Sequence, residues 1–365
     1  MSQKVFIIRA PFLRRFTAFY GHFGLHLRPV SRADPASLFS LLTNSLLIVL
    51  LNTLLFLLKP KQDSYQFVHR QKPLYALELK SIGLITPHVF NFCMVYFLLR
   101  GGLIVRLLDF SCFHLPETKK HLSPFITSQW SLPVLFVVDH VAFVCVFTHY
   151  IYVFDYNKRA FFGIIMYFTQ IVPSVLFRLT AYYKYLTWKA LQSIAEQHTG
   201  KVVTGQKIAN KVAELAILNK QLNSLFSPPL LLFTVFHSMQ SLTLLVGMFS
   251  QGFQAAGLII PLPIFTAAGG IVYFCKQIEN SLSRIQSGDC FVVSKSNRCY
   301  RLFNRRFRIR RSPPIAAILQ LHQLSLTYGR HFQLQIFIFY TFSSSSLIAL
   351  AMLILNFAVL LNQTK

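Results

Sequence analysis

Seven long apolar stretches alternate along the chain with segments that are rich in polar and basic residues. A transmembrane helix needs about 20 apolar residues, because each residue advances a helix by about 1.5 Å. The stretches that meet this requirement are residues 36–58, 81–105, 132–154, 160–183, 227–249, 256–275 and 336–361. The pattern therefore predicts an all-α, polytopic membrane protein with seven transmembrane helices.

Two connecting segments have a helical pattern of their own. In 184–226, apolar residues recur at spacings of three and four, at Ile208, Val212, Leu215, Ala216, Leu218 and Leu222. In 276–335, a helix start at Pro313 and Pro314 precedes a second apolar face. We expect both to be helical extensions of one transmembrane domain (36–361), which lies between an N-terminal segment (1–35) and a short C-terminus (362–365).

The charge distribution predicts the direction of the chain through the membrane. Charged residues make up 13% of the sequence, about half the share that is usual in soluble domains. There are 36 Lys and Arg against 11 Asp and Glu, and an inner N-terminus places 28 of the basic residues inside and 8 outside. Because Lys and Arg accumulate in cytoplasmic loops, we expect a cytoplasmic N-terminus and an extracellular C-terminus.

A basic cluster raises the question of nucleic acid as a partner. Seven arginines lie between Arg298 and Arg311 and are interleaved with Tyr300, Phe303 and Phe307, which also occurs in RNA-binding segments. The cluster lies between two predicted spans, so a loop held against anionic lipid of the inner leaflet explains it better. We therefore expect membrane lipid, and no nucleic acid, as a partner.

No catalytic or metal-binding pattern stands out. The sequence has no His-Glu-x-x-His, no Gly-x-Ser-x-Gly and no phosphate-binding glycine loop, and Cys290 and Cys299 lack metal-ligand spacing. None of the six cysteines falls in a segment predicted to be extracellular, so no structural disulfide is expected. The sequence predicts neither an enzyme nor a metal or cofactor site.

Three charged residues fall within predicted spans. Asp139 is the one acidic residue well inside a span, and Arg100 and Arg178 lie at a similar inner depth on the second and fourth spans. An unpaired charge in lipid costs at least about 2.5 kcal/mol. We expect an ion pair between Asp139 and one arginine, with a structural role first and a gating role as the alternative.

Two stretches of the chain resemble the insect gustatory receptors, which share a superfamily with the odorant receptors. That family ends its last helix with Thr-Tyr, five mostly hydrophobic residues and Gln-Phe. The matching stretch here keeps Gln363 and an aromatic residue at Phe357, whereas Asn356 and Thr364 replace Thr and Phe. The stretch 223–232, Asn-Ser-Leu-Phe-Ser-Pro-Pro-Leu-Leu-Leu, is similar to the start of the family's fifth helix.

The resemblance implies a chemosensory receptor that is a tetrameric, ligand-gated, non-selective cation channel in the cell membrane of sensory neurons. The last helices of four subunits would line one pore, and the inner helical layer would hold the tetramer, which contains identical or related subunits. The sugar-receptor branch usually has Glu after Thr-Tyr, and Ala358 stands there in this chain. The expected ligand is therefore a bitter or other non-sugar tastant.

The resemblance also implies a pocket among the second to sixth helices that opens to the outside. Candidate ligand-binding residues in the outer halves of these spans are His88, Asn91, His149, Tyr152, Tyr167, Gln170, Gln240 and Phe265. Polar and aromatic groups that converge in an apolar cleft suit a small organic ligand. The alternative is that Tyr and His near a membrane face are interface anchors.

The last span has two amide residues on one face. Asn356 and Gln363 are seven residues apart, so they lie on the same side of a helix, with Val359 and Leu360 between them. Rings of amides would let partly hydrated cations pass, and an adjacent aliphatic ring could close the path by dewetting. We predict that these four residues line the pore; in the alternative, the amides hydrogen-bond between helices.

Two other functions stay open at the level of sequence. Prolines interrupt several spans, as in secondary transporters, although no inverted repeat is visible. A metabotropic seven-helix receptor coupled to G proteins would need an extracellular N-terminus, which the charge bias opposes.

Overall fold

Most of the described chain is helical. The computed structural model describes residues 8, 10–21, 25–27, 35–57, 73–109, 123, 134, 137–138, 141, 156–197, 205–251, 262–286, 329–336, 340–341 and 343–363. In chain order the elements are α1 (Pro11–Gly21), α2 (Pro35–Leu57), α4 (Pro73–Leu108), α8 (Tyr156–Gln197), α9 (Gly205–Gln251), α11 (Leu262–Gln286), β1 (Gln335–Ile336), β2 (Tyr340–Thr341) and α14 (Ser344–Gln363). The described residues agree with the all-α prediction except for the short hairpin of β1 and β2, whereas nearly all of the predicted span 132–154 lies outside them.

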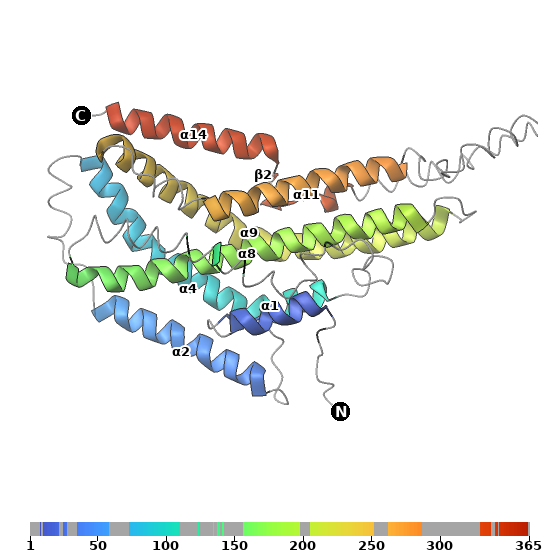
Figure 1. Cartoon of the computed structure of the whole chain (residues 1–365), viewed down its shortest axis with the longest axis horizontal. Helices are drawn as coiled ribbons and strands as arrows, with labels where there is room; N and C mark the ends of the chain where they lie inside the picture. The colour runs from blue at the N-terminus through green and yellow to red at the C-terminus, as the bar shows by residue number, and fades with distance from the viewer. Residues whose placement is uncertain are drawn as a thin grey trace, which may run out of the picture.

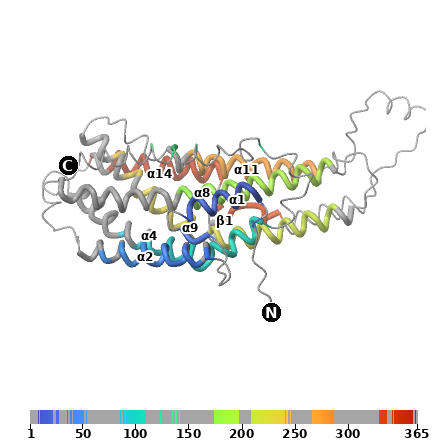
Figure 2. Tube along the Cα trace, turned by 60° about the horizontal axis from the view of Figure 1, so that its bottom comes forward, coloured from blue at the N-terminus to red at the C-terminus, as the bar shows by residue number. Residues whose placement is uncertain are grey.

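The helices form an elongated bundle with two different ends. Helix α9 packs against α4, α8 and α14, and α8 packs against α11. Figures 1 and 2 show α8, α9 and α11 running side by side and projecting at one end, whereas the C-terminal end of α14 lies at the other. We refer to these as the projecting end and the α14 end.

Several helices continue past their predicted spans. Helix α8 runs on to Gln197 and α9 already begins at Gly205, so both cover much of the segment 184–226. Helix α4 starts at Pro73 and reaches Leu108, which extends it into both predicted loops. Proline suits the start of α4, because the first residues of a helix have no use for their N–H groups.

The start of the last predicted span was wrong. Residues from 336 were expected to be helical, but Gln335 pairs with Thr341 and Ile336 with Tyr340 in a short antiparallel ladder. The sequence there is rich in aromatic and β-branched residues, which favour strands. The helix begins at Ser344, after Ser343, whose hydroxyl accepts a hydrogen bond from the backbone N–H of Ser346 at 3.2 Å. A serine in this position is a preferred helix cap.

The N-terminal segment is folded into the bundle. Helix α1 buries Phe12, Leu13, Phe16, Thr17 and Tyr20. The backbone N–H of Ala10 donates a 2.8 Å hydrogen bond to the carboxylate of Asp109, the residue that follows α4. The Phe12 ring lies 4.7 Å from the ring of Tyr182 on α8. The segment predicted only as cytoplasmic chain therefore packs against α4 and α8.

A pair of prolines interrupts the backbone hydrogen bonds of α9 without ending the helix. Pro228 and Pro229 have no N–H, so the carbonyls four residues earlier lose their helical partners. The hydroxyl of Tyr96 on α4 donates a hydrogen bond to one of these carbonyls, that of Leu225. A neighbouring helix thus satisfies the freed backbone group, as is common where proline occurs in membrane helices.

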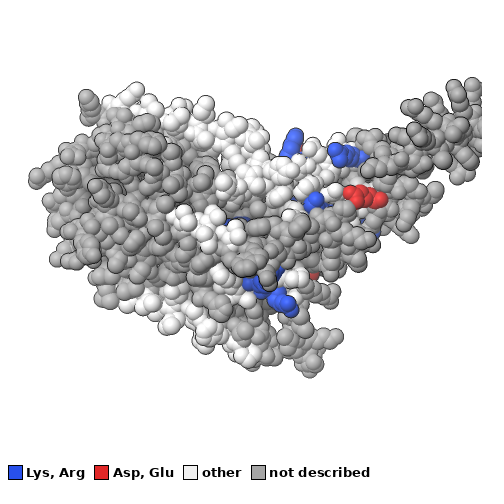
Figure 3. Space-filling model, in the orientation of Figure 1, with Lys and Arg blue, Asp and Glu red and all other residues white. Residues whose placement is uncertain are grey.

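Charge is distributed unevenly between the two ends. Helices α2 and α14 contain no Lys, Arg, Asp or Glu. On the face in Figure 3, the described charged side chains gather toward the projecting end. Among the described residues, the 18-residue window Asn91–Leu108 of α4 is long and apolar enough to cross a membrane, and Leu41–Leu50 and Ser344–Leu360 are shorter apolar stretches.

Candidate functional site

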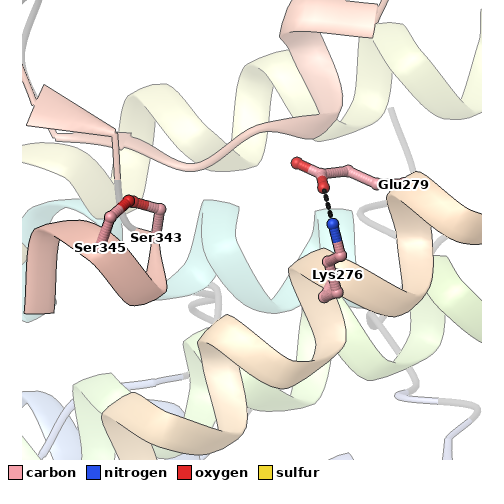
Figure 4. Close-up of polar contacts among 4 residues, drawn as sticks. All are labelled: Lys276, Glu279, Ser343 and Ser345. Carbon is pink, nitrogen blue, oxygen red and sulfur yellow. Dashed lines mark hydrogen bonds and ion pairs between the residues drawn. The ribbon is translucent and has the colours of Figure 1, made fainter. Parts of the chain in front are cut away.

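The first turn of α14 is held by serine hydroxyls. Besides the cap at Ser343, the hydroxyl of Ser346 donates a 2.7 Å hydrogen bond to the carbonyl of Thr341 in β2. The hydroxyls of Ser343 and Ser345 lie 3.1 Å apart, as the close-up in Figure 4 shows. These bonds fix where the last helix starts and tie it to the hairpin before it.

One face of α14 packs against the rest of the chain. Ile354 is 8% exposed and Ala358 is fully buried, and α9 is the helix that α14 contacts most. Leu347, on the same side, packs against the core as a partly buried residue. The neighbours of these residues on α14 are exposed, so a single narrow contact holds the helix to its own chain.

The opposite face carries the predicted amides. At about 100° per residue, a stripe that includes Asn356 and Gln363 lies about 160° from the packed side. Its members are exposed and include polar and apolar residues: Ser345, Ala349, Met352, Asn356, Val359 and Gln363. The predicted pore-lining residue Leu360 is 59% exposed beside this stripe. No partner within the described chain covers this face.

A buried polar joint lies below the start of α14. Lys184 on α8 is 0% exposed, and its Nζ donates hydrogen bonds to the Asn223 side-chain oxygen (3.1 Å) and to the carbonyl of Phe332 (2.8 Å). Asn223 on α9 donates in turn to the carbonyls of His331 and Gln333, both at 2.8 Å. Three successive carbonyls are thus held by two side chains; we call Lys184 and Asn223 the carbonyl clamp.

Neighbouring groups surround the clamp. The Tyr183 hydroxyl also donates to the Asn223 oxygen, and its ring stacks on Phe226 with centroids 5.2 Å apart. Burial lowers the pKa of Lys184 to about 8, against a smaller opposing effect of the Cys275 thiol. Burial likewise lowers the pKa of His331, and the charge of Lys220 lowers it further.

A cavity of about 200 Å³ lies on the other side of the clamped residues. It separates α11 from the segment 329–333 and is lined by Phe332 and Gln333 and, from α11, by Cys275 and Glu279. Glu279 forms an exposed ion pair with Lys276, with 3.5 Å between nitrogen and oxygen (Figure 4). Phe332 is nonetheless 3% exposed and part of the core, so both packing and the hydrogen bonds of the clamp hold the segment in place.

The predicted ligand-binding residues are described to different extents. His88 is exposed and Asn91 half-buried, one turn apart on α4. The backbone places Tyr167 and Gln170 on α8, Gln240 on α9 and Phe265 on α11, but their side chains are not among those described. His149 and Tyr152 lie outside the described residues. The four helices that carry the described members belong to one bundle, but whether these residues meet in one pocket stays a prediction.

The predicted ion pair is described on one side. Arg178 is half-buried on α8 and its Nε donates a 3.0 Å hydrogen bond to the hydroxyl of Ser174, one turn earlier. Arg100 is exposed near the C-terminal end of α4, and Asp139 lies outside the described residues. The pairing of Asp139 therefore stays a prediction.

Sequence reasoning missed the clamp and one aromatic cluster. The clamp joins residues about a hundred positions apart, and Asn223 had been noted only as part of the stretch 223–232. His237 packs against Phe233 and Phe236, with ring centroids 6.2 and 5.5 Å away, one turn before the predicted ligand residue Gln240. An aromatic triplet at helical spacing on α9 was the available signal.

Comparison with solved structures shows that the fold of this chain is similar to that of an insect olfactory receptor. The structure of olfactory receptor OR5 from Machilis hrabei in complex with eugenol matches with a TM-score of 0.65, over 97% of this chain and 98% of that one, at 12% identity. A second structure of the same receptor matches with a TM-score of 0.60 and 10% identity over the same shares. No family model matches the sequence, and no curated protein matches it significantly.

Proposed function

We propose that this protein is a chemosensory receptor subunit that acts as a ligand-gated, non-selective cation channel in the cell membrane. The fold shared with an insect olfactory receptor over nearly the full length of both chains supports the receptor class. The degenerate signature at Asn356, Phe357 and Gln363 favours the gustatory branch, and Ala358 favours a non-sugar tastant. We further propose that the receptor works in sensory neurons.

The observation that carries the proposal is the exposed polar face of α14. An unpaired amide in an apolar medium costs a few kcal/mol, so Asn356 and Gln363 are poorly placed against lipid. The packed side of the helix faces away from them, so they do not bond to α9. In a tetramer with the packed sides outward, four copies of this stripe would enclose a path with both polar and apolar rings.

The charge pattern of α14 supports conduction of cations without tight binding. The helix has no charged residue, so no fixed charge would trap an ion. The carbonyl end of a helix carries a partial negative charge, and in α14 this is the end with Gln363. Four such ends around the outer mouth would favour cations over anions.

A small organic molecule is the proposed ligand class. The similar receptor was solved with eugenol, a small aromatic compound. The His237 cluster and the predicted residues around Gln240 would offer aromatic faces and hydrogen-bonding groups in the outer part of the bundle. We propose that this region, between α4, α8, α9 and α11, takes the tastant.

Recording from the purified full-length protein in planar bilayers tests the proposal. We expect unitary cation currents, and Gln363→Glu should raise the permeability to divalent relative to monovalent cations. Asn356→Cys and Gln363→Cys should become blockable by thiol reagents. The matched control is Ile354→Cys, which faces α9 and should resist block.

The outcomes separate the proposal from its alternatives. Unchanged selectivity in Gln363→Glu, together with equal thiol block at positions 354, 356 and 363, would show that α14 lines no pore. Substrate flux without unitary currents would favour a transporter. An N-terminal epitope that stains in unpermeabilised cells would favour a G-protein-coupled receptor, because the proposed channel has its N-terminus in the cytoplasm.

A further inference from the structure

The carbonyl clamp connects two parts of the molecule that have different proposed tasks. Lys184 and Asn223 belong to α8 and α9, whose other halves carry Tyr167, Gln170 and Gln240 among the candidate ligand residues. The clamped carbonyls of residues 331–333 come directly before β1, which leads through the hairpin into α14. The clamp is thus a direct contact between the bundle and the base of the last helix.

Breaking the hydrogen bonds of the clamp is unfavourable in free energy. Within the described part of the chain, no carboxylate pairs with the fully buried amine of Lys184, and carbonyl and amide oxygens satisfy its charge instead. A hydrogen bond from a charged donor is stronger than one between neutral groups, and a buried donor left without a partner adds a further penalty. The segment 331–333 therefore has one strongly favoured position on α8 and α9.

The surroundings of the clamp leave space into which the segment 331–333 can move. The cavity beside Phe332 and Gln333 leaves room on the side of α11. Pro228 and Pro229 interrupt the helical hydrogen bonds of α9 just beyond Asn223, and such breaks are where helices bend. A bend of α9 at this break moves Asn223 relative to the ligand-side half, and the clamp carries the segment 331–333 along.

We propose that Lys184 and Asn223 are positioning residues that couple the bundle to the pore helix and hold the base of α14 where the pore is shut. The inference rests on the proposed channel function and assigns the part of the chain that controls it. A pore closed by a narrow apolar ring is tight in one arrangement, so a loosened base lets the ring widen and leak. Val359 and its copies are the ring that such loosening would open.

The test is the ligand-independent open probability of the full-length protein in planar bilayers. We expect Lys184→Met and Asn223→Leu to raise it about tenfold or more, with unitary conductance and permeability ratios unchanged, because the pore residues are intact. The two effects should be less than additive, because both side chains share one hydrogen bond. Tyr183→Phe, a milder change that removes one donor to Asn223, should raise it by a smaller factor.

Thr187→Val is the matched control. The Thr187 hydroxyl donates a 3.1 Å hydrogen bond to Asn219, so this pair also joins α8 to α9 in the core, one turn away, without touching residues 331–333. The control should leave the open probability unchanged. An equal rise in Thr187→Val, or wild-type behaviour of Lys184→Met, Asn223→Leu and Tyr183→Phe, would overturn the coupling role.

Hydrogen exchange separates the clamp from the channel proposal. Backbone amides at 332–336 should exchange faster in Lys184→Met and Asn223→Leu than in Thr187→Val or the wild type. Faster exchange without unitary currents in any variant would overturn the channel function while leaving the clamp as a structural tie. Unchanged exchange would overturn the clamp itself.

Discussion

Helices α8 and α14 are both long and apolar, but they differ in how far their own chain buries their side chains. From Ser174 to Ile194 most side chains of α8 are buried by the same chain, and none is exposed. On α14, Ile354 and Ala358 are the buried ones, and Met352, Phe357 and Leu360 are more than half exposed. Residues 174–194 of α8 are thus covered within one chain, whereas most of the described surface of α14 is not.

Truncating one leucine in each helix tests this difference in burial, and it should give the largest effect. Leu186 on α8 is fully buried, and Leu353 on α14 is 53% exposed. Leu186→Ala should destabilise the protein by about 2–5 kcal/mol, because it leaves a cavity in a packed core. Leu353→Ala should change the stability of the detergent-solubilised subunit by about 0.5 kcal/mol or less. Thermal unfolding measures both, and equal losses would mean that α14 is packed as tightly as α8.

The buried amine of Lys184 on α8 makes the stability of the folded protein depend on pH. The folded-state pKa of Lys184 is about 8, below the 10.5 of an exposed lysine, so between these values the unfolded chain holds a proton that the folded chain has lost. Stability therefore rises as pH increases through this window. The melting temperature of the wild type should gain a few degrees relative to Lys184→Met between pH 8 and pH 10. Parallel profiles of the two proteins would contradict a buried, titrating lysine.

Gly101 tests how closely the N-terminal segment is packed against α4. A methyl group at this position would lie 2.3 Å from the backbone carbonyl oxygen of His26. Gly101→Ala should therefore cost about 1–3 kcal/mol, because backbone has to move. Gly269→Ala on α11, where no atom lies within 4 Å, is the control and should be neutral or slightly stabilising. The difference between the two melting temperatures measures the tightness of the N-terminal contact.

The smallest expected effect concerns the proline break in α9. Tyr96→Phe removes the hydroxyl that satisfies the carbonyl of Leu225 and should cost about 1 kcal/mol. Leu99 lies on the same helix and is 73% exposed, so Leu99→Ala is the control, with little change expected. A loss confined to Tyr96→Phe would confirm that α4 supports the break.

The sequence predicted the helices well and the joints between them poorly. Apolar length located α2, α8, α9 and α14 because crossing a bilayer imposes it on each helix separately. The hairpin before Ser344 was missed because the same apolar run satisfies a helix and a strand. The clamp could not be predicted, since Lys184 binds a carbonyl 148 positions away and a backbone carbonyl has no sequence signature.

The candidate pore was predicted in part for the same reason. The seven-residue spacing of Asn356 and Gln363 already placed both amides on one side of a helix. Their orientation relative to the bundle needed the contact of Ile354 and Ala358 with the core. That contact depends on the shape of α9, which no residue of α14 encodes.

The docking of α1 has a consequence for how the protein is made. Helix α1 and its described flanking residues are synthesised before their binding site, which includes Asp109, Gly101 and Tyr182. The segment around α1, whose Phe12, Leu13 and Phe16 are buried in the folded protein, therefore cannot dock until α4 and α8 have been made. Its docking then reports that these helices have assembled, so a quality-control protease could distinguish finished subunits from unfinished ones by whether it can reach this end of the chain.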